Sequence, residues 1–386
     1  MNKFLLACIT AGLLLVGLYL AINKSLTHSV QSQTETSSQI NNDPNTKTLL
    51  SPQTDTLEQQ QHDTTQNESE SDISSETITL CDNKEANFSA FEQLAKQATN
   101  NHGVFDNHTL LATIKDNAAT LESKITYALL SYAQNPEQPH PLITLFSEYP
   151  HNRYLAHHTL LACTTQVCDK QTIQSALNTD RNNGASWLAY ASLIDPKEDP
   201  QHTLNAINNA ANAQDYNEYR QQTYYFYDET LNQLNINNDL LFLIGVESIL
   251  AAAPTPSFST INKTCSNVTQ DEVRLLDACI NIGERLEQSQ STLISTAIGI
   301  ALQRKAYEVR NDQSEIAFLN EKTQNFQKLL TQSSLATQLM WQSEQLFKNY
   351  IQVIKNSNEV DATRYLVEQA ITLSNEPDFD PCVSSW

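Results

Sequence analysis

Glycine is scarce in this chain, at 7 of 386 residues, where average usage is roughly 7%. Gly12 and Gly17 lie in the apolar N-terminal segment, and the other five are spread between Gly103 and Gly299. Phosphate-binding loops, nucleophile elbows and tight β-hairpins need glycine where the backbone takes positive φ or touches a ligand. The scarcity therefore argues against nucleotide-binding α/β folds and against all-β folds.

Basic residues are also few. Lysine and arginine total 23 against 44 aspartates and glutamates, which gives a formal net charge of −21. A face that follows a nucleic-acid backbone needs clustered lysine and arginine, and no such stripe exists here. The composition indicates no nucleic-acid partner, and its simplest interpretation is a solvated, soluble surface.

The chain has one long uncharged run, the nineteen residues Phe4 to Ile22. That length can cross a bilayer of about 30 Å as a helix, so residues 1–25 are predicted to be an uncleaved signal anchor. A cleaved signal peptide is the alternative. The short N-terminal tail and the slight positive-inside bias predict a single pass through the inner membrane, with the bulk of the chain in the periplasm. Residues 26–80 are polar and predict a disordered linker.

Residues 81–386 carry apolar side chains at helical spacing, with prolines between the segments. This pattern predicts an all-α domain of stacked antiparallel helix pairs, solenoid-like, with a subdivision near 255–265 left open. Residues 240–253 are apolar nearly all round and predict a buried central helix.

Three local signals predict where helices and turns lie. Asp169 is expected to cap a helix, and Asn182-Asn183-Gly184 predicts a turn because asparagine and glycine tolerate positive φ. Thr269 and Glu272 predict a capping box, supported by a hydrophobic staple from Val268 to Val273.

Residues 187–213 form a helix pair in which an aromatic residue faces small alanines. Trp187, Tyr190-Ala191 and Ile194 on the first helix, with Ile207 and Ala210 on the second, resemble a tetratricopeptide-type unit; Thr203 stands where that repeat has alanine. The resemblance covers this one unit and implies a helical-repeat architecture with partner binding.

Seven cysteines are present, and without Cys8 six remain, which permit fifteen pairings. If the domain is exported from the cytoplasm, its cysteines are expected to form disulfides. Cys163 and Cys168 flank one interhelix turn and are the first expected pair. Cys265 can reach Cys279 only if the chain runs back along the helix, so a buried free thiol at Cys279 stays open. Cys81 and Cys382 would join the two ends of the domain.

The sequence indicates no cofactor. Cys163 and Cys168 with His157 and His158 are the one metal-site alternative, but their spacing is not the common zinc spacing. Tyr224 and Tyr225 lie on a predicted helix and are candidates for contact with a peptide, since tyrosine suits interfaces.

These features favour a membrane-tethered scaffold or adaptor that binds a protein or peptide partner in the cell envelope. The alternative is a peptidoglycan hydrolase. Glu284 followed by Gly299-Ile300-Ala301-Leu302-Gln303 resembles the catalytic segment of lytic transglycosylases, although Arg285 replaces a serine and Ala301 is inserted. A third hypothesis, a luminal protein of a eukaryote, is permitted by Asn-x-Ser/Thr triplets such as the one at Asn262.

Overall fold

The computed structural model describes residues 77–81, 107–134, 140–164, 166–236, 239, 242–243, 246, 249, 258–289 and 291–383. The predicted anchor (1–25) and all but the last four residues of the predicted linker (26–80) lie outside this set. No helix among the described residues is both long enough and apolar enough to cross a membrane.

The described part of the chain contains fourteen helices and no strand, which confirms the predicted all-α class. The helices of its first half are α3 (Asn107–Asp116), α4 (Leu121–Gln134), α5 (Pro141–Glu148), α6 (Arg153–Ala162), α7 (Lys170–Thr179), α8 (Gly184–Ala191), α9 (Pro200–Asn212) and α10 (Arg220–Gln233). Those of its second half are α12 (Ser259–Ser266), α13 (Val273–Ser289), α14 (Leu293–Arg310), α15 (Gln313–Met340), α16 (Glu344–Asn356) and α17 (Glu359–Ser374).

Capping residues set most helix starts, as the sequence predicts at Asp169, whose carboxylate accepts the Thr172 N–H at 2.8 Å. The predicted capping box forms only in part. Glu272 accepts the Thr269 N–H at 2.9 Å, but α13 begins at Val273, three residues after the start that a box with Thr269 as N-cap predicts. The staple prediction is wrong, because Val268 is buried while Val273 is 57% exposed.

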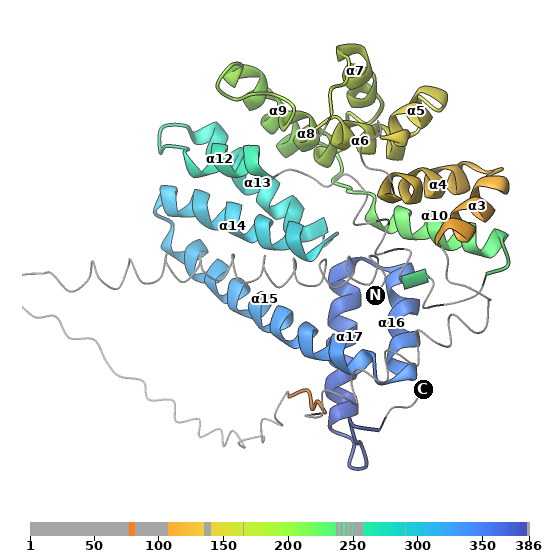
Figure 1. The fold of residues 1–386 in the computed structure, drawn as a ribbon. Coiled ribbons are helices and arrows are strands. Elements are labelled where there is room, and N and C mark those ends of the chain that lie inside the picture. Colours follow the sequence, from red (N-terminus) through yellow and green to blue (C-terminus); the bar gives the residue numbers. More distant parts are fainter. Residues whose placement is uncertain are drawn as a thin grey trace, which may run out of the picture. The chain divides into compact units, whose positions relative to one another are not determined.

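Helix contacts run through the domain and return to their start (Figure 1). Each helix from α3 to α9 packs on the next, α9 packs on α13, and the contacts continue through α14 and α15 to α16 and α17. α10 then packs against both α4 and α16, which closes the series. Helices distant in sequence therefore meet around α10.

Two apolar clusters fill the interior, and each contains residues from both sides of the possible subdivision near 255–265. One cluster joins Ile207 of α9 to Ile261 of α12 and Leu302 of α14, so it draws residues from both sides of that point. It also holds Trp187, Tyr190 and Ala210 of the tetratricopeptide-like pair. Of the predicted helix 240–253 only part is described; there, the four buried core residues are Phe242, Leu243, Val246 and Ile249.

All six cysteines of the domain form disulfides, in the three pairs weighed from the sequence: Cys81–Cys382, Cys163–Cys168 and Cys265–Cys279. α12 lies against α13, which is the return path that Cys265 requires, and Cys279 is not a free thiol. Three disulfides indicate an oxidising, extracytoplasmic environment.

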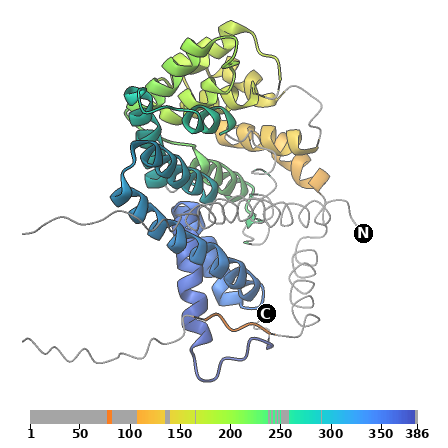
Figure 2. The same ribbon diagram turned by 90° about the vertical axis from the view of Figure 1, so that its left-hand side faces the viewer.

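The segment 77–81 lies beside the C-terminal end of α17 (Figure 2). The Thr79 N–H donates to Ser374 Oγ at 3.0 Å, Ile78 is buried and Leu80 packs against the core. Residues 77–80, assigned to the linker from their polar surroundings, therefore belong to the folded part, because Ile78 is buried and the partly buried Leu80 packs against the core.

Glycine is required where α13 crosses α14. A Cβ atom on Gly299 would stand 2.5 Å from the Gly283 carbonyl oxygen and 2.7 Å from the Glu287 amide nitrogen. Both obstacles are backbone atoms, which cannot rotate away. The two glycines thus allow the helices to approach with backbone against backbone.

Replacing Gly299 with alanine should destabilise the domain. Overpacking costs about 1–3 kcal/mol, which outweighs the gain of about 1 kcal/mol in helix propensity. Urea unfolding of the full chain measures the difference, with Ala301→Ser, at an exposed position of the same helix, as the control. A stability equal to or above that of the wild type would contradict the crossing geometry.

Candidate functional site

The two tyrosines proposed as partner contacts lie on α10 with different exposure. Tyr225 is 55% exposed and Tyr224 is 1% exposed. The Tyr224 hydroxyl accepts a hydrogen bond from Arg220 Nε at 3.0 Å, and the side chain lines a cavity. Tyr225 is therefore open to solvent, whereas Tyr224 belongs to a cavity wall.

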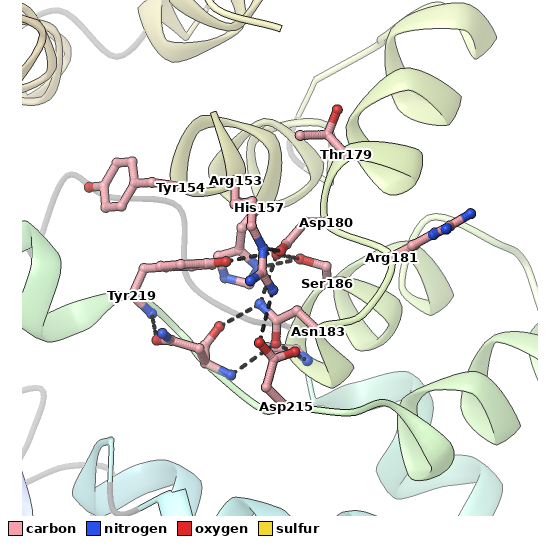
Figure 3. Close-up of polar contacts among 12 residues, drawn as sticks. Arg153, Tyr154, His157, Thr179, Asp180, Arg181, Asn183, Ser186, Asp215 and Tyr219 are labelled. Carbon is pink, nitrogen blue, oxygen red and sulfur yellow. Dashed lines mark hydrogen bonds and ion pairs between the residues drawn. The ribbon is translucent and has the colours of Figure 1, made fainter. Parts of the chain in front are cut away.

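A buried carboxylate organises the connections next to this cavity (Figure 3). Asp180, which follows α7, is fully buried. Its Oδ1 accepts from Arg153 Nε at 2.6 Å and from the Tyr219 hydroxyl at 2.9 Å. Its Oδ2 accepts from Ser186 Oγ at 2.6 Å and from Asn183 Nδ2 at 2.8 Å. Four donors from α6, α8 and the segments before α8 and α10 thus converge on one side chain, which we call the Asp180 cluster.

His157 lies against Ser186 of the Asp180 cluster, but the serine, histidine and aspartate lack the order of a catalytic triad. His157 Nδ1 lies 2.9 Å from Ser186 Oγ, and the serine gives its own proton to Asp180. In a triad the carboxylate orients the histidine and the histidine takes the serine proton. Here the serine stands between the other two. Burial also lowers the pKa of His157 to about 3, so the cluster is a structural network.

The Asp180 cluster fixes the connection between α9 and α10. The Asn183 side chain accepts from the Asn217 N–H at 2.9 Å and donates to the Asn217 carbonyl at 2.8 Å. The Gly184 N–H donates to the Asp215 carbonyl at 2.8 Å. A Cβ on Gly184 would stand 2.8 Å from the Ala210 carbonyl oxygen. Close approach, rather than the positive φ predicted for this turn, is what requires glycine here.

The fixed connection forms one wall of a cavity of about 200 Å³. The other walls come from the turn between α13 and α14 and from the start of α17. The lining residues are Tyr216, Asn217, Glu218, Arg220, Gln221, Tyr224, Ser289, Ser291, Asn358 and Glu359. Polar side chains from three distant stretches of the chain therefore converge beside the start of α10, and we call this space the Glu218 cavity.

Glu218 is a buried carboxyl group of this cavity, at 8% exposure. Its Oε1 accepts from Ser295 Oγ at 2.6 Å and from the Tyr216 hydroxyl at 3.3 Å. Burial raises the pKa of Glu218, and the hydroxyl donors and the positive charge of Arg220 offset part of that rise. A carboxyl group with a perturbed pKa in a cavity is a marker of functional sites.

Arg220 and Glu359 form a charged pair on the cavity wall. Arg220 Nη2 lies 3.5 Å from Glu359 Oε2, and the guanidinium stands 5.9 Å from the centre of the Tyr224 ring. Glu359 is the first residue of α17, where the helix dipole favours a negative side chain. Together with Glu218, the pair gives the cavity wall two carboxyl groups and one guanidinium group.

The residues of the metal-site alternative and of the lytic-transglycosylase resemblance make structural contacts. Cys163 and Cys168 are joined in a disulfide, so neither sulfur is a thiolate that could bind metal, and no group of three metal-ligating side chains occurs in the described ranges. Gln303 donates to Glu287 at 2.9 Å rather than to Glu284. Gly299 serves the helix crossing. In the segment that resembles lytic transglycosylases, Gly299 and Gln303 thus contact residues of α13 and help to pack it on α14.

Sequence reasoning did not single out Asp180 or Glu218. A single aspartate after a helix and a single glutamate near a run of tyrosines carry no motif, and their partners lie up to 77 residues away. No protein-family model, curated protein or solved structure matches the chain.

Asp180→Asn should lower the free energy of unfolding by about 3 kcal/mol, because the amide introduces donors where Arg153 and Tyr219 already donate. Denaturant unfolding of the full chain tests this, with the exposed Asp271→Asn as the control, which should change stability by less than about 0.5 kcal/mol. Equal losses in both variants would show that the Asp180 cluster has no special role.

Glu218→Gln should stabilise the domain at pH 7.5. The folded-state pKa of Glu218 is raised, so the carboxylate costs stability above that pKa, and the cost disappears below the unfolded value of about 4.3. The difference between Glu218→Gln and wild type should therefore shrink as the pH falls towards 4. Glu284→Gln, on the half-buried face of α13, is the matched control. A variant less stable than wild type at pH 7.5 would refute the argument.

Proposed function

We propose that the protein is a membrane-tethered helical scaffold or adaptor that binds a protein or peptide partner outside the cytoplasm, through the surface around the Glu218 cavity. The proposed location is the inner membrane, with one pass near the N-terminus and the bulk in the periplasm. The tetratricopeptide-like pair at 187–213 is, in this proposal, part of a helical-repeat frame.

One observation carries the proposal. Glu218 is a buried carboxyl group whose burial disfavours its charged form, and it lies in a cavity assembled from three stretches of chain. Such a group is costly for stability, and costs of this kind are retained at functional sites. The exposed Tyr225 lies one residue from Tyr224 of the cavity wall and supplies an aromatic contact beside it.

Site-specific crosslinking in cells tests this function. A photo-crosslinking residue replaces Gln221, which is exposed and lines the cavity, in the full-length chain. The control places the same residue at Gln171, exposed on α7. We expect one discrete protein adduct in the membrane fraction from position 221 and none of that size from 171.

Two results would contradict the proposal. The same adducts from both positions would indicate nonspecific contact, and no adduct from position 221 would indicate that no protein lies there. Fractionation of the unmodified chain checks the tether separately, because a protein with an uncleaved anchor stays with membranes after alkaline extraction.

A further inference from the structure

Hydroxyl groups, which carry no charge, are the donors to Glu218 Oε1. Arg220, the cation among the described residues of the cavity wall, is paired with Glu359, and its charge also acts on Glu218. With both carboxyl groups ionised, these three side chains carry one negative charge in excess. An entering cation would compensate that excess, whereas an entering anion would increase it.

We infer that the Glu218 cavity binds the ammonium or guanidinium group of one basic side chain of the partner, with Glu218 as its counter-charge. This inference rests on the proposed function, since the basic side chain is carried by the protein or peptide partner. It names what that partner must present at the contact.

The dimensions of the cavity fit a side chain rather than a folded element. A volume of about 200 Å³ lies below the roughly 300–1,000 Å³ of pockets that enclose a whole drug-sized ligand. The end of one lysine or arginine with part of its methylene stem is of the order of this smaller volume. Tyr216 and Tyr224 line the same space, and aromatic faces favour both methylene groups and cations.

Glu218 is held in place for such a contact. The Thr292 hydroxyl donates to Ser295 Oγ at 2.8 Å, and Ser295 donates in turn to Glu218. On the other side, the neighbouring Tyr219 is anchored on Asp180. Since both flanks are fixed before any ligand arrives, little conformational entropy is lost on binding.

Titration calorimetry of the full-length protein with blocked pentapeptides tests the inference. The peptides are Gly-Gly-X-Gly-Gly, with lysine, arginine or the neutral isostere norleucine at X. We expect the lysine or the arginine peptide to bind at least tenfold more tightly than the norleucine peptide. Glu218→Gln should weaken that binding at least tenfold, and Glu284→Gln should leave it within twofold of wild type.

Glu218→Asp keeps the charge but withdraws it by one methylene, so it should bind more tightly than Glu218→Gln. Thermal melts of each variant check that the domain is folded. The inference is overturned if neither basic peptide binds wild type at millimolar concentration, if norleucine binds equally well, or if Glu218→Gln binds as wild type does.

The crosslinking experiment separates this inference from the proposed function. If position 221 yields a specific adduct that Glu218→Gln does not reduce, the adaptor function holds and the cationic contact fails. If basic peptides bind through Glu218 but no adduct forms in cells, the cavity chemistry holds and the adaptor function fails.

Discussion

The burial of Asp180 is the constraint on which the candidate site depends. A charged carboxylate removed from water is tolerated only where donors replace its hydration, and Asp180 receives four of them. Those donors belong to α6, to α8 with the residue that caps it, and to the residue that precedes α10. Satisfying one side chain therefore sets the relative positions of these elements, and it fixes the connection that carries Tyr216, Asn217 and Glu218 into the cavity.

The two buried carboxylates have opposite energetic roles. Asp180 is paired with a guanidinium at 2.6 Å and holds the frame together. Glu218 faces a cavity, and the donors on its Oε1 are hydroxyls. Its hydroxyl donors and the charge of Arg220 offset only part of the cost of burial, and such a cost is retained where it serves a function. The contrast is what distinguishes a structural acid from a candidate binding residue in this chain.

Local signals in the sequence predicted much of the fold. Helical periodicity, the cap at Asp169 and the cysteine positions depend on neighbours within a few residues or on a small number of pairings. The details that failed depend on distant contacts. Val273 is exposed although its sequence suggests a staple, and Gly184 is needed because Ala210 approaches it from another helix. The cavity could not be predicted for the same reason: Glu218 meets Ser295, 77 residues further along the chain, only after the intervening helices have packed.

The bond between Cys81 and Cys382 makes residues 81 to 382 one covalent ring, in which the other two disulfides are nested. A single proteolytic cut inside this ring releases no fragment, because both new ends stay attached through the sulfur bridge. Every stretch that lines the cavity lies inside it. In a compartment where proteases act on exposed loops, a nicked molecule would keep all the residues of the cavity wall in one covalent unit.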